Sequence, residues 1–134
     1  MKLNFIKRIC KTNEVLWNNP RGHIEYNLEH NMLKEELEEL KQAITNASFS
    51  NEPMIESETE MLDALVDIIY VAVGSMHKLG LTPQQIDNAI NIVCDANEAK
   101  SGKKNADGKV SKPDNFPEPQ PKLKKLLEER NFDE

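Results

Sequence analysis

The segment from Met61 to Val73 constrains the fold of this chain more than any other, because nearly all of its residues are apolar. The charged exceptions are Asp63 and Asp67. The apolar run is longer than a typical strand and no hairpin turn divides it, so it predicts a helix over residues 56–79. The segment is too short and too charged to span a bilayer. A helix that is apolar on nearly every side is buried, so other helices are expected to pack around it.

The remaining sequence also favours helices, and no clear strand pattern is present. Thr82, Pro83 and Gln85 form a helix-start signal, with threonine as the N-cap and proline in the first turn. Gly80 is a suitable end for the preceding helix. We predict helices over residues 2–17, 22–46, 56–79, 83–100 and 120–130. The predicted fold class is therefore all-α, a four- to five-helix bundle in which the second and third helices form an antiparallel pair.

Length and charge narrow the classes of protein further. The 134 residues support one domain, in which residues 1–121 form the all-α body and residues 122–134 a C-terminal helix or tail of the same domain. The 23 acidic and 17 basic residues give a net charge of −6, which argues against binding to a nucleic acid polymer. Two cysteines are too few for a disulfide scaffold and no signal peptide is recognisable, so we expect free thiols and a cytoplasmic location.

Carboxylates form a narrow stripe on the helix predicted over residues 56–79. At 100° per residue, Glu60, Asp63 and Asp67 fall within about 60° of one another. Tyr70 continues the stripe, where it can contact a sugar, hydrogen-bond a carboxylate or pack in the core. The three acids therefore form a narrow acidic face on an otherwise apolar helix.

The helix predicted over residues 22–46 carries a second set of acids. Glu36 and Glu39 lie on the shoulder of its apolar face. Glu35 lies at the edge of that face, and Glu38 lies on the solvent side. Four glutamates this close usually form a solvated face, but the helical geometry divides them: Glu36 and Glu39 face inward, Glu38 faces solvent and Glu35 lies on the edge.

Packing of the two helices brings four carboxylates together: Glu36, Glu39, Glu60 and Asp63. Buried carboxylates without a partner repel one another and are strongly unfavourable, so a cation must compensate. Hard oxygen ligands favour Mg²⁺, Mn²⁺ or Ca²⁺. The alternative is pairing with lysine or arginine from neighbouring helices, or a groove in which the acids reach solvent.

The helix predicted over residues 83–100 and the segment after it supply groups that suit an anionic ligand. Asn97 continues the apolar stripe of this helix, where it can hydrogen-bond a ligand or pack. Five lysines follow closely, and Lys100, Lys103 and Lys112 are candidates to meet phosphates as point charges. The acidic body and this basic segment together favour a small polyanion held on metal.

The order of these motifs resembles the MazG-like superfamily of all-α nucleoside triphosphate pyrophosphatases, which includes the phosphoribosyl-ATP pyrophosphohydrolases. The ExxE…ExxD signature of that superfamily is matched by Glu36-x-x-Glu39 and Glu60-x-x-Asp63. The Asn-x-x-Lys and Lys-Pro segments of its smaller phage-like and bacterial members are matched by Asn97-x-x-Lys100 and Lys112-Pro113. The resemblance spans residues 28–121.

The resemblance implies a Mg²⁺-dependent enzyme, with Mn²⁺ as a substitute, that cleaves the α–β phosphate bond of a nucleoside triphosphate. The products are the monophosphate and pyrophosphate. The implied metal ligands are Glu36, Glu39, Glu60 and Asp63, and the implied water-activating residue is Glu35. Substrate contacts are assigned to Asp67, Tyr70, Asn97, Lys100 and Lys112. The resemblance also implies a homodimer or homotetramer, and it suggests a house-cleaning role against non-standard or deoxy nucleotides.

Two other functions stay open at this point. One keeps the enzyme but makes phosphoribosyl-ATP the substrate. The other is a non-catalytic helical protein that binds a metal or a partner, in which the acids are structural and the basic segment docks the partner. A purely structural role for the acids predicts no saturable binding of Mg²⁺ or Mn²⁺, so metal titration separates it from the enzyme.

Overall fold

The computed structural model describes residues 2–49, 55–100 and 102–132, so the last two residues of the predicted tail 122–134 lie outside this description. The described residues form five α-helices and one π-helical turn, and their only strand-like feature is an isolated bridge between Lys104 and Val110. The elements are α1 (Lys2–Lys11), η1 (Thr12–Leu16), α2 (Tyr26–Ser48), α3 (Ile55–Lys78), α4 (Pro83–Glu98) and α5 (Gln120–Glu128). The predicted all-α fold class is confirmed.

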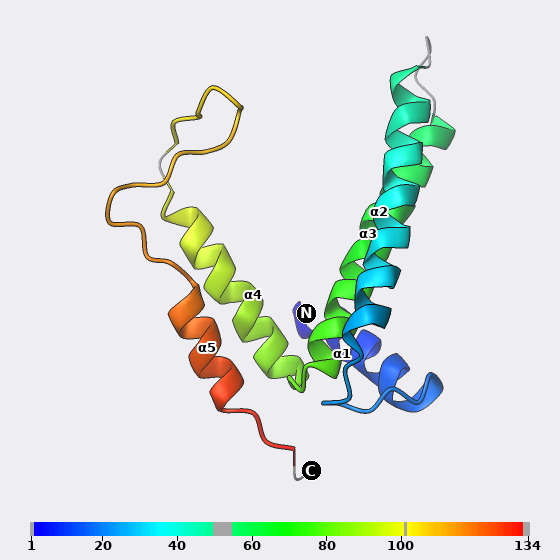
Figure 1. Cartoon of the computed structure of the whole chain (residues 1–134), viewed down its shortest axis with the longest axis vertical. Coiled ribbons are helices and arrows are strands. Elements are labelled where there is room, and N and C mark those ends of the chain that lie inside the picture. The colour runs from blue at the N-terminus through cyan, green and yellow to red at the C-terminus, as the bar shows by residue number, and fades with distance from the viewer. Residues whose placement is uncertain (1, 50–54, 101, 133–134) are drawn as a thin grey trace.

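The helices form two arms that diverge from a common base (Figure 1). One arm is the antiparallel pair of α2 and α3, as predicted, and the other arm is α4 with α5. Helix α1 lies at the base, where it contacts both α3 and α4. A loop that carries most of the lysines after α4 lies at the far end of the second arm.

The hydrophobic core is concentrated at this base. The α1 residues Ile6 and Ile9 are buried there against Val73 of α3 and Ile86 of α4. The spacing of the two isoleucines places them on one face of α1, which is why a ten-residue helix can dock as a unit. The α2–α3 pair therefore grows out of a packed base, and its outer turns are held mainly by contacts between the two helices.

A tight corner separates α3 from α4. Gly80 has a φ of +104°, a backbone conformation that favours glycine, and a side chain at this position would meet the ring of Phe132. The predicted capping box is present, because Thr82 Oγ1 accepts from the Gln85 amide at 3.2 Å and Gln85 Oε1 accepts from the Thr82 amide at 3.0 Å. The two helices consequently meet at a bend of 118°.

The N-terminal segment departs from the predicted helix boundaries. The predicted helix 2–17 is α-helical only as far as Lys11 and then widens into the π-helical turn η1. Helix α2 begins at Tyr26 and not at residue 22, because Gly22 has a φ of +88° and the preceding Pro20 lies in a loop. This loop allows α2 to start at the base and run beside α3.

The expectation that the helix over residues 56–79 is buried on nearly every side is not met within one chain. Leu62, Leu65, Val66 and Ile69 are each 45–62% exposed along the outer part of α3. In the described part of the chain, no single helix is both long and apolar enough to cross a membrane. Helices α3 and α4 taken together have the necessary length and composition, but they are separated by a sharp bend.

Candidate metal centre

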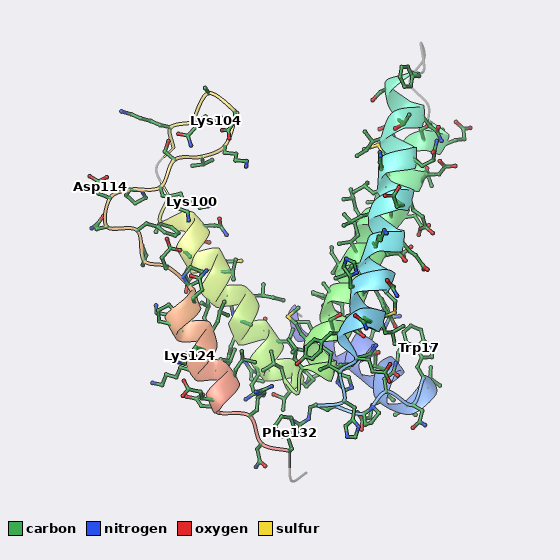
Figure 2. All side chains as sticks on the ribbon, in the orientation of Figure 1. Trp17, Lys100, Lys104, Asp114, Lys124 and Phe132 are labelled. Atoms are coloured by element: carbon green, nitrogen blue, oxygen red, sulfur yellow. The ribbon has the colours of Figure 1, made fainter. Side chains whose placement is uncertain are left out.

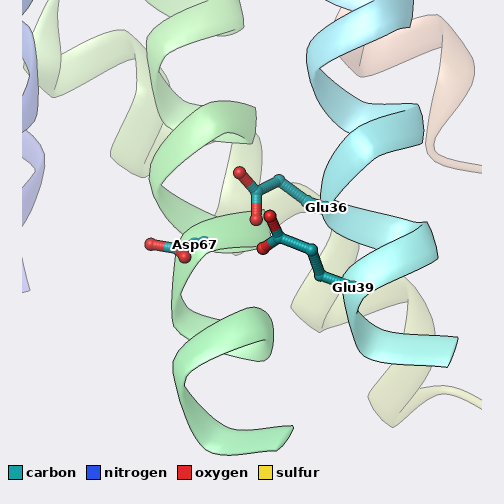
Figure 3. Close-up of side chains that lie close together, drawn as sticks. All are labelled: Glu36, Glu39 and Asp67. Carbon is teal, nitrogen blue, oxygen red and sulfur yellow. The ribbon is translucent and has the colours of Figure 1, made fainter. Parts of the chain in front are cut away.

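Three carboxylates meet between α2 and α3. Glu36 and Glu39 come from one face of α2, since residues three apart are neighbours on a helix, and Asp67 comes from α3 (Figure 3). One oxygen from each of the three lies within 4.8 Å of the others. We call this set the acid cluster. Figure 3 shows Glu36 and Glu39 pointing from α2 toward α3, where the Asp67 carboxylate lies, so the cluster offers neighbouring oxygen ligands of the kind that hard divalent cations bind.

The acid cluster is electrostatically strained in the absence of a cation. Burial, followed by the charges of Glu39 and Asp67, raises the pKa of Glu36 above its ordinary value. Burial, followed by the charges of Asp63 and Glu39, also raises the pKa of Asp67. Both shifts mean that the ionised carboxylates are disfavoured where the fold places them.

The donor set fits a metal ion. Glu36 Oε2 is buried and has no hydrogen-bond partner, which is unusual because buried polar atoms are nearly always satisfied. None of the ion pairs between described residues includes a member of the acid cluster, so pairing with lysine or arginine does not account for it. A divalent cation would satisfy the orphaned oxygen and offset the repulsion in one step.

Two of the predicted metal ligands lie beside the acid cluster and not within it. Glu60 and Asp63 are exposed on α3 and line an open pocket of about 260 Å³ together with Glu39. The charge of Asp63 reaches Asp67, since it is one of the causes that raise the pKa of that residue. The acids therefore continue from the cluster toward the outer end of the helix pair.

The two other predicted acids, Asp67 and Glu35, lie in and beside the acid cluster. The sequence assigned Asp67 to the substrate, but its carboxylate lies in the acid cluster. The sequence did contain a signal for this position, because helical periodicity puts Asp67 on the same stripe of α3 as the predicted ligands Glu60 and Asp63. Glu35 is exposed on α2, and its charge is the smallest of the causes that raise the pKa of Glu36. It lies close enough to act on that carboxylate electrostatically.

Tyr70 lies one turn from Asp67 and packs partly against the core. Its ring is 5.8 Å from the ring of Trp17, centroid to centroid. It also lines an apolar pocket of about 390 Å³ with residues of the N-terminal segment, among them Arg8 of α1 and Thr12 of η1. Sequence reasoning missed this contribution of α1, because no periodicity links residues so far apart in the chain.

Asn97 and the lysines lie on the other arm. Asn97 was expected on the buried stripe of α4, but it is exposed and donates to the carbonyl of Val93 on its own helix. Lys100 follows at the far end of that arm (Figure 2). Lys112 Nζ lies 3.5 Å from Glu118 Oε1 and 5.1 Å from the ring centre of Phe116. A single chain does not bring these three residues to the acid cluster.

Comparison with family models gives a match over residues 3–92 to the phosphoribosyl-ATP pyrophosphohydrolase family. No curated protein matches the chain. The family match covers about two thirds of the chain, includes the acid cluster, begins well before residue 28 and ends before Asn97. The chain therefore belongs to the phosphoribosyl-ATP pyrophosphohydrolase family, a group of pyrophosphohydrolases within the MazG-like all-α superfamily.

Proposed function

We propose that this protein is a Mg²⁺-dependent nucleotide pyrophosphohydrolase that adds water across the α–β phosphate bond of a nucleoside triphosphate and releases the monophosphate and pyrophosphate. The observation that carries the proposal is the acid cluster with its unpartnered Glu36 oxygen, in a chain of this family. The binding of a small polyanion to an acidic site needs a metal between them, because like charges repel.

In this proposal Glu36, Glu39 and Asp67 hold the metal, and Glu60 and Asp63 extend the site toward the outer end of the helix pair. When bound, the metal neutralises phosphate charge and makes an attacking water more acidic. Glu35 is the group that accepts the proton of that water, since it is an exposed carboxylate adjacent in sequence to a ligand. Tyr70 lies one turn further along α3, where it can contact the sugar or base.

Phosphoribosyl-ATP is the second candidate substrate, and the family match is the observation that favours it. It contains the same α–β phosphate bond. A choice between the two substrates depends on groups beyond the phosphates. The apolar pocket between α1 and α3, lined by Arg8 and Tyr70, is a surface that suits a base.

A substrate panel tests the proposal directly. The purified protein with Mg²⁺ is expected to release pyrophosphate from at least one standard or non-standard nucleoside triphosphate, or from phosphoribosyl-ATP. Pyrophosphate and orthophosphate are measured separately, with and without EDTA. Release of orthophosphate as the first product, or turnover that EDTA leaves unchanged, would contradict the proposal.

We also propose that the protein is a homodimer or homotetramer in which a second copy covers the exposed apolar face of α3. Leu62, Leu65, Val66 and Ile69 form this face and are largely open within one chain. Contiguous apolar surface of this kind favours association. A second copy also offers a route by which Lys100 and Lys112 reach an acid cluster, since within one chain the end of α4 and the loop after it lie on the other arm from the α2–α3 pair (Figure 1).

Light scattering at micromolar concentration is expected to give twice or four times the mass of the chain. Val66→Asp or Ile69→Asp should shift the measured mass toward that of the monomer, because association would bury an unpaired carboxylate. Val110→Asp is the matched control, since Val110 is an exposed apolar residue of the loop after α4. A monomeric wild-type protein would contradict this proposal but would not test the metal-binding role of the acid cluster.

A further inference from the structure

Helix α2 is attached to α3 by very few buried side chains. Of its 23 residues only Glu29 and Ala43 are buried, and Glu29 is just 6% exposed. Glutamate is among the residues that are least often buried unless they are paired. The burial of this one near the start of α2 therefore calls for a reason.

Glu29 is held by two residues from the last turn of α3. Lys78 Nζ donates to Glu29 Oε2 at 3.1 Å and to Oε1 at 3.3 Å. Ser75 Oγ donates to Glu29 Oε1 at 2.8 Å. Lys78 is itself only 5% exposed, so both charges of the pair are removed from solvent. We call Glu29, Ser75 and Lys78 the Glu29 clamp.

The Glu29 clamp and the acid cluster belong to one register of the helix pair. Glu36 lies seven residues after Glu29 on α2, and Asp67 lies eight residues before Ser75 on α3. In an antiparallel pair these two steps of about two helical turns run in the same direction along the axis, so the same register forms both contacts. Ala43 and Ala64 are both buried further out, where their small size lets the backbones approach closely.

The two kinds of buried contact differ in how sharply they define the register. Apolar contacts such as those of Ala43 tolerate repacking, because apolar contact is non-directional. A slip of one helical turn moves α2 by about 5.4 Å along α3. That slip would leave the Glu29 and Lys78 charges buried and unpaired, which is strongly destabilising. Among the buried contacts of α2, only the Glu29 clamp carries this directional penalty.

We propose that Glu29, Ser75 and Lys78 are positioning residues, which fix the register of α2 on α3 so that Glu36 and Glu39 face Asp67. The role in metal binding rests on the proposed function, whereas the role in register does not. The clamp acts through the acid cluster from about two helical turns away and does not itself touch the substrate.

Distance measurement between spin labels tests the register in the metal-free protein. Labels are placed at Lys34→Cys on α2 and Glu58→Cys on α3, which are exposed and offset along the axis, in a Cys94→Ala background. Cys10 stays unlabelled, since it is buried and its thiol pKa is raised to about 11. Dilution with unlabelled protein removes distances between copies.

Two variants of the clamp separate register from stability. Glu29→Gln leaves Lys78 buried without its charge partner. The double variant Glu29→Gln/Lys78→Met removes both charges and can recover stability, since apolar replacement of a buried ion pair is often neutral or better. Glu25→Gln is the matched control, because Glu25 is an exposed glutamate directly before α2.

Both clamp variants are expected to broaden or shift the label distance, and Glu25→Gln to leave it unchanged. They should also weaken Mn²⁺ binding about 10- to 100-fold, the usual loss when groups that orient metal ligands are removed. A double variant with wild-type stability but poor Mn²⁺ affinity would show positioning apart from folding. Unchanged distances in both variants would overturn the proposal. Absence of Mn²⁺ binding in the wild type would count against the proposed function, and the distances would still decide the register.

Discussion

Glu39→Gln is expected to lower pyrophosphate release by at least about 100-fold while the helical content stays the same. Glu39 lies in the acid cluster and also lines the pocket that contains Glu60 and Asp63, so it is common to both groups of acids. Removal of groups that merely orient metal ligands already costs 10- to 100-fold, and loss of a ligand should cost no less. Glu39 is exposed, so glutamine leaves no cavity and should not unfold the helix.

Steady-state kinetics with circular dichroism on the same samples measure this effect. Glu38→Gln is the matched control, since Glu38 is one residue away and exposed, outside the acid cluster. Asp67→Asn should behave like Glu39→Gln, because Asp67 completes the cluster. Near-normal activity in Asp67→Asn together with a large loss in Asp63→Asn would indicate that the metal is bound by Glu60 and Asp63 and not by Asp67.

Glu36→Gln is expected to stabilise the metal-free protein at pH 7 and to remove most of the stabilisation by Mg²⁺. The pKa of Glu36 is raised, chiefly by burial and then by the charges of Glu39 and Asp67. The folded state therefore binds the proton of Glu36 more tightly than the unfolded chain does. Ionisation at neutral pH costs folding free energy, and glutamine avoids that cost.

The sign of this effect sets the pH dependence. Stability of the metal-free wild type should fall as the pH rises from about 4, the ordinary value for these carboxylates, through the raised pKa values of Glu36 and Asp67. Glu36→Gln should flatten that decline and raise the unfolding midpoint at pH 7. Mg²⁺ at 100 times its dissociation constant should stabilise the wild type by about 2.7 kcal/mol.

Thermal unfolding from pH 4 to 8, with EDTA or with Mg²⁺, measures both parts of the prediction. Glu38→Gln again serves as the control, because it removes an equal charge from the solvent side of the same helix. A metal-free Glu36→Gln protein that is less stable than the wild type at pH 7 would show that the carboxylate is favourable where it lies. If Mg²⁺ stabilised that variant as much as it stabilises the wild type, Glu36 would not be a metal ligand.

Local patterns in the sequence were sufficient to predict the helices and the antiparallel pair that carries the acids. The apolar run before Gly80 and the capping box at Thr82 are short-range signals, and both appear in the structure. Helical periodicity also placed Glu36 and Glu39 on one inward shoulder, because a helix turns by the same angle at every residue. Family membership added the reaction class, which no periodicity contains.

Tertiary structure decided which acids meet and which predicted partners stay apart. Periodicity put Asp67 on the same stripe as Asp63, but the register of α2 on α3 selects Asp67 for the acid cluster. Asn97 fitted an apolar stripe in the sequence, yet the 118° corner after α3 carries α4 away from the acids and leaves Asn97 exposed. Glu29 and Lys78 look like ordinary surface residues until the two helices are paired.

The sequence by itself therefore determined the elements and the chemical character of their faces, since both depend on residues a few positions apart. Only the tertiary structure decided the register, the divergence of the arms and the members of the acid cluster. These depend on contacts such as that of Glu29 with Lys78, 49 residues apart, whose free energy exists only after the chain has brought them together.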